Sequence, residues 1–168
     1  MNPFSIRTLQ PEDKPELLRF EQNNREWFER HVDPRGHAFY TADGVHEHVT
    51  QYLAAYAQST WHPCVVVDQS GAIVGRANLK DIDLAAGSAE VGYRMAQHCV
   101  GRGLATLAVR HLVELARSHW KLHRLVAYVS DKNVASASVL AKCGFGRANH
   151  TETNSAGRSA PPFVLDLR

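Results

Sequence analysis

The fold of this protein is decided by residues 89–109, which read AEVGYRMAQHCVGRGLATLAV. Over Ala89–Ala96 the apolar residues alternate with polar or small ones, which is the period-two pattern of a β-strand. From Gly103 to about Trp120 the apolar residues recur at helical spacing instead. The glycine-rich segment His98–Ala105 therefore joins a strand directly to the N-terminus of the best-defined helix in the sequence.

This junction of strand and helix predicts an anion-binding site. Glycine lets the backbone approach a phosphate closely, the N–H groups of a first helical turn point outward, and the helix dipole adds roughly half a positive charge. Arg102 can add a charge-assisted contact. Two common phosphate motifs do not fit: a P-loop needs a Lys-Ser/Thr pair after its glycines, and Thr106 occupies the third glycine position of a dinucleotide fingerprint. A turn that merely starts a helix remains the simpler alternative.

Length and composition are those of one globular domain, residues 1–168. The chain has 168 residues, of which 44% are hydrophobic, and this is enough to bury a core. The formal charge of +2 is too small for non-specific nucleic-acid binding, which requires a clustered basic surface. We therefore expect no nucleic-acid partner, and any bound anion should be held at a local site.

The N-terminal residues and the cysteines predict a soluble cytoplasmic protein with no membrane partner. Met1–Gln10 lacks the basic and apolar regions of a secretory signal, and no run of 18 apolar residues is present. The three cysteines are odd in number and widely spaced, which argues against a disulfide framework and against a zinc site. His119 and His123 have the spacing of a helical metal site but no acidic or cysteine partner nearby, so we expect no metal.

The remaining patterns place strands and helices in turn along the chain. The first half should contain a strand over Phe4–Leu9, a helix over Glu12–Glu29 that breaks near Asn23 and Asn24, and a helix over Val45–Ser59 capped by Asp43. A meander of three strands follows at Val65–Val67, Ile73–Ile82 and Ala89–Ala96. Beyond the helix that starts at Gly103, we expect a strand at Leu125–Val129, a helix at Asn133–Cys143, strands at Phe145 and Phe163–Leu167, and a mobile loop at Thr151–Ser159. This order requires at least one parallel strand pair with a crossover helix.

The glycine-rich segment resembles the phosphate-binding motif of the GNAT superfamily of N-acetyltransferases. In that motif a Gln or Arg is followed by two residues, a Gly, one further residue, and a Gly or Ala. Val100, Gly103 and Ala105 occupy these positions, and Gly101 is an extra glycine that relatives commonly carry. Val100 departs from the pattern, which removes one side-chain contact but leaves the backbone N–H groups in place.

A second block, Asn133–Phe145, is similar to the family's N-x-x-S and K-x-G-F pattern, at the spacing seen in relatives. Asn133 also fits a helix N-cap and Gly144 a helix C-cap, but neither role explains why both blocks occur in this order. Within the superfamily, the chain looks closest to the Rim-type branch of ribosomal-protein alanine or serine N-terminal acetyltransferases.

The resemblance implies an α/β (α+β) GNAT fold that binds acetyl-CoA as cosubstrate, without a metal. Its central sheet is mixed but mostly antiparallel, with about six to seven strands, splayed between two central strands and flanked by about four helices. The cofactor is expected to enter where the strands part. The residues implied to contact it are Tyr93, Met95, Val100, Gly101, Arg102, Gly103, Leu104, Ala105, Asn133, Ser136 and Lys142.

The implied reaction is transfer of the acetyl group to a primary amine by direct attack in a ternary complex. The acceptor is either a protein N-terminus or a small molecule, and the enzyme is a monomer or a homodimer. Early segments that also resemble the Rim-type branch, Leu18–Glu21, Asn24–Arg25 and Gly75–Leu79, are expected to shape the acceptor pocket. The alternative is a CoA-binding sensor or scaffold with little catalysis, which the missing family side chains at Val100 and Leu140 would favour.

Catalysis of acyl transfer requires an unprotonated amine, a stabilised oxyanion and a proton for the leaving thiolate. By resemblance, a backbone N–H near Met95 serves the oxyanion. Leu140 stands where many relatives carry a Tyr acid, so Ser136 or water is expected to protonate the thiolate. Glu90 and Glu152 are the candidate bases, although Glu152 aligns poorly and Glu90 can equally pair across the sheet with a basic residue, Arg76 or Lys80.

Overall fold

The computed structural model of the protein describes residues 2–31 and 33–168. Within these residues a seven-stranded sheet has the order β1-β2-β3-β4-β5-β9-β6, and β7 and β8 form a separate two-stranded sheet. Every neighbouring pair in the large sheet is antiparallel except β4 and β5. The mixed, mostly antiparallel sheet predicted from the sequence is therefore confirmed, and so is the parallel pair with a crossover helix.

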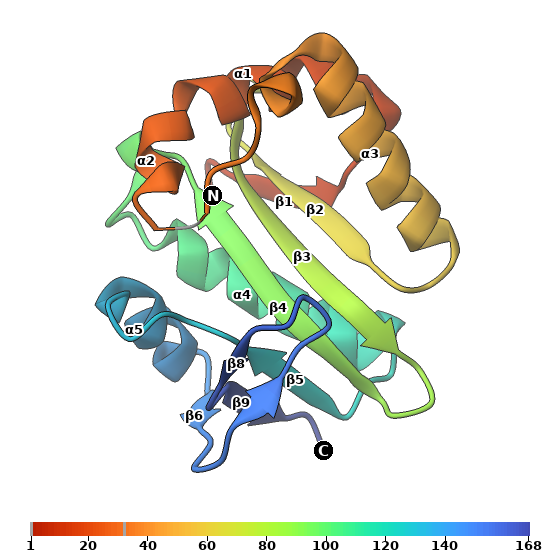
Figure 1. Cartoon of the computed structure of the whole chain (residues 1–168), viewed down its shortest axis with the longest axis vertical. Helices are drawn as coiled ribbons and strands as arrows, with labels where there is room; N and C mark the ends of the chain where they lie inside the picture. The colour runs from red at the N-terminus through yellow and green to blue at the C-terminus, as the bar shows by residue number, and fades with distance from the viewer. Residues whose placement is uncertain (1, 32) are drawn as a thin grey trace.

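Helices cover both faces of the sheet (Figure 1). Helices α1 (Lys14–Asn23), α2 (Arg25–Glu29) and α3 (Ala42–Ala57) lie over one face, and α4 (Leu104–Glu114) lies over the other. Helix α5 (Val134–Lys142) packs against α4, which gives five α-helices in the described chain where the sequence predicted about four. None of the described helices is long and apolar enough to cross a lipid bilayer.

The N-terminal helices begin after β1 (Ser5–Thr8) and a short 3-10 turn, η1 (Pro11–Asp13). The predicted break lies at Asn24, whose backbone leaves helical geometry between α1 and α2. Asn24 is held in place because its amide donates to the Phe20 carbonyl at 2.8 Å and accepts from the Gln97 N–H at 3.0 Å. The break in the helix thereby fixes α1 and α2 next to the end of β4.

Helix α3 follows a second 3-10 turn, η2 (His37–Tyr40), and starts three residues earlier than predicted. Thr41, not Asp43, is its N-cap: the Thr41 hydroxyl accepts a hydrogen bond from the Gly44 N–H at 3.1 Å. The prediction of Asp43 was wrong because it relied on the first apolar residue of the helix, whereas the first turn here is polar and exposed.

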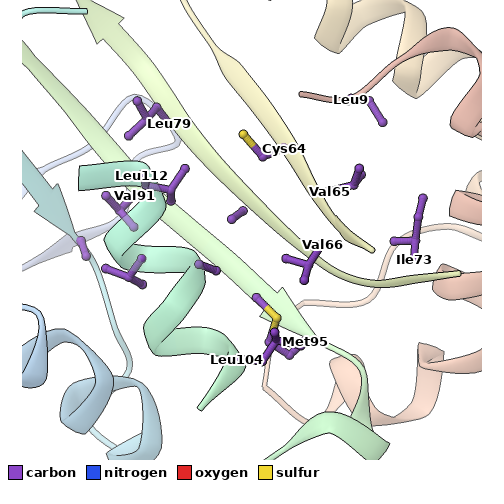
Figure 2. Close-up of a cluster of buried hydrophobic side chains, with 14 of the residues drawn as sticks. Leu9, Cys64, Val65, Val66, Ile73, Leu79, Val91, Met95, Leu104 and Leu112 are labelled. Carbon is purple, nitrogen blue, oxygen red and sulfur yellow. The ribbon is translucent and has the colours of Figure 1, made fainter. Parts of the chain in front are cut away.

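The meander consists of β2 (His62–Val67), β3 (Ile73–Asp83) and β4 (Ser88–Met95). The turn between β2 and β3 is closed by Asp68, which accepts hydrogen bonds from the N–H groups of Ser70 and Ala72. Apolar side chains from these strands pack with those of α4 in the core, as Figure 2 shows for Val91, Met95, Leu104 and Leu112. This packing holds the N-terminal end of α4 against the end of β4.

The second half completes the sheet. A short 3-10 turn, η3 (Gln97–Cys99), precedes α4, and a π-helical turn, η4 (Leu115–His119), extends α4 toward β5 (Arg124–Ala127). After α5, Gly144 has a φ of +93°, the left-handed conformation of a helix C-cap, as predicted. The remaining strands are β6 (Gly146–Arg147) and β9 (Phe163–Asp166).

The segment predicted as a mobile loop is a hairpin. Strand β7 (Glu152–Thr153) pairs antiparallel with β8 (Ser159–Ala160). The Asn154 side chain accepts from the Arg158 N–H and so closes the turn. Composition suggested a loop because Thr, Asn, Ser and Gly dominate the segment, but the same polar side chains supply the hydrogen bonds that order it.

Candidate active site

The central feature of the site is the parting of β4 and β5. The two strands pair only over Ser88–Glu90, although β4 continues to Met95. Within the described chain, residues 91–95 have β3 on one edge and no strand on the other, which we call the open edge of β4. The splay between the central strands, expected from the sequence, is thus present in the structure.

The open edge presents the backbone of alternate residues. The Ala96 N–H donates to the Val74 carbonyl at 2.8 Å, toward β3, and the β3–β4 register is regular from Met95 back to Glu90. Because N–H and C=O directions alternate along a strand, the backbone groups of Tyr93 and Met95 point away from β3. They are therefore available to the amides of an extended ligand such as pantetheine.

The glycine turn lies at the end of this edge and is open to solvent. Gly101 and Gly103 have φ values of +82° and +74°, and a Cβ at either position would meet nothing within 4 Å. The first helical hydrogen bond of α4 runs from Leu107 to the Gly103 carbonyl, and no side chain caps the helix. Among the described residues, the N–H groups of Leu104–Thr106 thus have no acceptor, and together with the helix dipole they favour an anion.

Two side chains border the turn. Val100 is 55% exposed. The Arg102 guanidinium lies 5.2 Å from the centre of the Phe4 ring, and this stacking on an aromatic face holds it beside the turn. Arg102 can therefore still contact a phosphate, whereas Val100 offers only apolar surface.

Comparison with known proteins agrees with this geometry. Residues 4–146 match the acetyltransferase (GNAT) domain family. The chain belongs to the GNAT acetyltransferase family. It is 30% identical over 151 residues to the probable N-acetyltransferase YjcK of Bacillus subtilis (strain 168), which covers 89% of this chain and 83% of that protein. It is also 28% identical over 81 residues to the uncharacterized N-acetyltransferase p20 of Bacillus licheniformis, 48% of this chain and 46% of that protein.

Solved structures of other acetyltransferases share the fold of this GNAT domain. The ribosomal-protein-S5-alanine acetyltransferase from Vibrio fischeri superposes with a TM-score of 0.89 at 22% identity, covering 99% of this chain and 94% of that one. Mycobacterium smegmatis RimJ, in complex with CoA-disulfide, has a TM-score of 0.84 at 21% identity, with coverage of 97% and 81%. The spermidine N-acetyltransferase from Vibrio cholerae, in complex with CoA and spermine, reaches 0.75 at 21% identity, with coverage of 98% and 96%. The Rim-type neighbours agree with the branch that the sequence resembles, and at these identities the likeness concerns the fold alone.

The second sequence block lies across the open edge from β4. Asn133 caps α5 by accepting from the Ser136 N–H at 3.1 Å, and the Tyr93 hydroxyl donates to the Ser136 carbonyl at 3.3 Å. Burial raises the pKa of Tyr93, so its hydroxyl stays protonated at neutral pH. The Ser136 hydroxyl has no hydrogen-bond partner among the described residues and remains available. Leu140 is fully buried, so its position contributes packing and no proton.

Lys142 lies apart from this group, at the C-terminal end of α5, where it is exposed. It lies six residues beyond Ser136, or about 9 Å along the helix at 1.5 Å per residue. The adjacent Cys143 thiol contacts the Thr106 carbonyl in the first turn of α4 at 3.8 Å. The two ends of α5 therefore border different parts of the site.

Glu90 is held between two partners. Its side chain is 8% exposed, Oε2 lies 2.7 Å from the Lys80 ammonium, and Oε1 accepts from the Asn154 amide at 3.0 Å. Of the two cross-sheet partners considered from the sequence, Lys80 is the one used. Glu90 is thus close to the open edge, but it must exchange a partner before it can accept a proton.

Glu152 lies on the β7–β8 hairpin in an ion pair. Its carboxylate is 2.7 Å from Arg124 and 2.8 Å from the ring of His150. The hydrogen bond from Arg124 is the main cause that lowers the pKa of Glu152. A carboxylate with a lowered pKa is a weaker base, which counts against Glu152 in this role.

A layer of buried charged residues lies between strands β3 and β4 and the helices α1 and α3 that cover them. The sequence indicated only part of this layer. Glu21 of α1 is fully buried, 2.9 Å from Arg76 and 3.7 Å from Arg94. Arg76 also donates to His48 of α3 at 2.8 Å. Burial, and then the charge of Arg76, lower the pKa of His48 to about 2, so this ring is neutral and accepts the hydrogen bond.

The segments expected to shape the acceptor pocket supply two members of this layer, Glu21 and Arg76. His48 and Arg94 were not predicted in it. One signal could have indicated a buried carboxylate: Glu21 follows Leu17 by four residues and therefore lies on the apolar stripe of α1. No comparable signal marks His48, because its position becomes meaningful only when α3 packs on the sheet.

Proposed function

We propose that this GNAT domain, residues 1–168, transfers an acetyl group from acetyl-CoA to a primary amine by direct attack in a ternary complex. The acceptor is a protein N-terminus or a small molecule, and three cysteines without disulfides favour the reducing cytoplasm as its location. The observation that carries the proposal is the open edge of β4 leading directly into an uncapped helix N-terminus. An extended carrier ending in a diphosphate is complementary to both parts.

In this proposal the cofactor is held mainly by backbone. The diphosphate accepts hydrogen bonds from the N–H groups of Leu104–Thr106, each contributing about 1.5–3 kcal/mol as a charge-assisted bond. Pantetheine lies along the open edge and pairs with Tyr93 and Met95. Binding through the backbone is consistent with a valine at position 100. Losing the side-chain contact of the family's Gln or Arg weakens the site without removing it.

The chemical step is assigned to groups around the same edge. A backbone N–H of the open edge near Met95 stabilises the oxyanion, and a donor in this role typically accounts for roughly a hundredfold or more in rate. The Ser136 hydroxyl, or a water on it, protonates the leaving thiolate. Glu90 accepts the proton of the amine through a water, and an α-amino acceptor would need little help because its pKa is about 8.

The test is release of free thiol from acetyl-CoA in the presence of a panel of amines, with the acetylated product identified by mass spectrometry. We expect turnover with at least one amine class and a saturable dependence on both substrates. The alternative, a CoA-binding sensor or scaffold, is favoured by Val100 and by the buried Leu140. Tight CoA binding by calorimetry without thiol release on any amine would establish that alternative.

A further inference from the structure

The charged layer beside the open edge contains more positive than negative charge. Arg76 and Arg94 are cross-strand partners on β3 and β4, and Glu21 is the carboxylate that contacts both. A third guanidinium, that of Arg35, lies 4.2 Å from the centre of the Phe39 ring, which packs against His48. His48 is neutral, and the charges of Arg76, Arg35 and Arg94 all act on its ring, so three guanidinium groups and one carboxylate, Glu21, surround this part of the layer.

Two of these arginines lack acceptors for their hydrogen bonds. Arg76 donates to Glu21 and to His48. In the described part of the chain, neither Arg35 nor Arg94 donates a hydrogen bond, and the Nη1 atom of Arg35 is buried. Arg94, 25% exposed, stacks 4.9 Å from the centre of the Phe28 ring instead. A desolvated guanidinium without acceptors is unfavourable, and its planar donors fit a carboxylate well.

The guanidinium groups of Arg35 and Arg94, neither of which donates a hydrogen bond to a described residue, lie within electrostatic reach of one another. Burial is the first cause that lowers the pKa of Arg94 to about 10, and the charge of Arg35 contributes to the same shift. Arg94 therefore remains charged at neutral pH. It is also the residue between Tyr93 and Met95, so its Cα is about 3.8 Å from those of the residues that line the open edge.

We propose that Arg35 and Arg94 bind a carboxylate of the acceptor, so that this enzyme acetylates amines that carry a carboxylate within about one amino-acid length of the amino group. The proposal rests on the function proposed above and names the acceptor class of the same site. Free amino carboxylates and peptides with an acidic second residue both present this chemistry. Polyamines do not, because an excess of guanidinium charge repels them.

Matched pairs of acceptors test the proposal. We compare alanine with alaninamide, the C-terminally amidated dipeptide Ala-Glu-amide with Ala-Gln-amide, and add spermidine as a polycation. The carboxylate member of one pair should have a kcat/KM at least tenfold higher than its neutral partner, even though alaninamide has the more easily deprotonated amine. The pair that shows the preference identifies the source of the carboxylate. Equal or higher kcat/KM for both neutral partners, or for spermidine, overturns the proposal.

Variants locate the effect. Arg94→Gln and Arg35→Gln should each raise KM for the carboxylate acceptor about tenfold and leave KM for acetyl-CoA unchanged, and Arg94→Lys should restore part of the loss. Arg30→Gln is the matched control, because Arg30 is an exposed guanidinium stacked 5.8 Å from the Trp27 ring. An unchanged acceptor KM in both Gln variants would refute the assignment.

A separate measurement distinguishes failure of the proposed transferase reaction from failure of the carboxylate site. If no amine releases thiol, the proposed transferase reaction is wrong, and binding decides the inference. Calorimetry on the CoA-loaded protein should then show that N-acetylalanine binds at least tenfold more tightly than N-acetylalaninamide, and that Arg94→Gln removes the difference. Equal affinities for the two compounds would overturn the carboxylate site.

Discussion

Gly103 begins α4 with a φ of +74° and open space where a side chain would stand. A Glu at this position places bulk and negative charge over the N–H groups proposed to bind diphosphate. We expect Gly103→Glu to weaken CoA binding more than a hundredfold, measured by calorimetry. Gly71→Glu is the matched control, because Gly71 also has a positive φ, +89°, and open surroundings, but lies in the β2–β3 turn. Equal CoA affinity in the two variants would contradict the diphosphate site.

A substitution at Val100 should strengthen CoA binding at the same site rather than weaken it. Replacing this exposed valine with the family's arginine adds one cation beside the diphosphate, and a partly exposed contact of this kind should tighten CoA binding about three- to tenfold. Leu84→Arg adds the same charge at a similarly exposed residue, 57% against 55%, in the β3–β4 turn. A gain in CoA affinity that Leu84→Arg reproduces would assign the effect to net charge rather than to the site.

The hydroxyl of Ser136 belongs to the chemical step if it protonates the thiolate. Ser136→Ala removes it but keeps the N–H that Asn133 accepts and the carbonyl that Tyr93 contacts. We therefore expect kcat to fall about tenfold or more while the affinity for CoA stays within a factor of two. Tyr93→Phe serves as the comparison at the other end of that hydrogen bond. An unchanged kcat in Ser136→Ala would assign the proton to water or to Tyr93.

At the scale of elements, the sequence predicted features that a local apolar or glycine pattern encodes. The strand, glycine turn and helix over residues 89–109 were predictable because each has a local signal. The apolar spacing marks the strand and the helix, and the glycines mark the turn that needs positive φ angles. The start of α3 and the β7–β8 hairpin were not, since a polar first turn and a polar hairpin carry no apolar pattern. The charged layer depends on four separate segments meeting, at Glu21, His48, Arg76 and Arg94, which no local pattern encodes.

His62 of β2 contacts residues from two other parts of the chain, and its burial makes the stability of the folded protein depend on pH. It is buried, exchanges a hydrogen bond with Thr8 of β1 and accepts one from Trp120 after α4. Burial lowers the pKa of His62 to about 4 from 6.5, so between these values the unfolded chain binds the proton and the folded protein does not. Stability is therefore fully present above pH 6.5 and declines by up to about 3 kcal/mol as the pH falls toward 4. Urea unfolding at pH 7.5 and 4.5 measures it.

The control for His62 is His62→Gln, which has no ring to protonate. Protonation of ion-paired carboxylates such as Glu152 also lowers the free energy of unfolding on acidification, and this loss is the same in wild type and His62→Gln. The difference between wild type and His62→Gln at the two pH values therefore isolates the histidine. The same pH-dependent loss in both would show that His62 is not the group that titrates.

At the scale of the whole molecule, the sheet consists of two halves joined through a short parallel contact. β1 to β4 form one half, and β5, β9 and β6 form the other. Among residues 2–31 and 33–168, only Ser88–Glu90 of the first half pair with β5. A cofactor along the open edge would supply further contacts between the halves. Binding should therefore stabilise the entire fold, and cooperative unfolding should report it.

The expected size of this stabilisation follows from mass action. Acetyl-CoA at a hundred times its Kd adds about 2.7 kcal/mol, which corresponds to a rise in Tm of roughly 5–10 °C for a domain of this size. Gly103→Glu should abolish the rise and Gly71→Glu should keep it, whatever their own Tm values. ADP at the same concentration lacks the pantetheine that pairs with Tyr93 and Met95, so it should give a clearly smaller rise. A larger rise with ADP or ATP than with acetyl-CoA would instead identify the glycine turn as a nucleotide site, because only the phosphates would then be recognised.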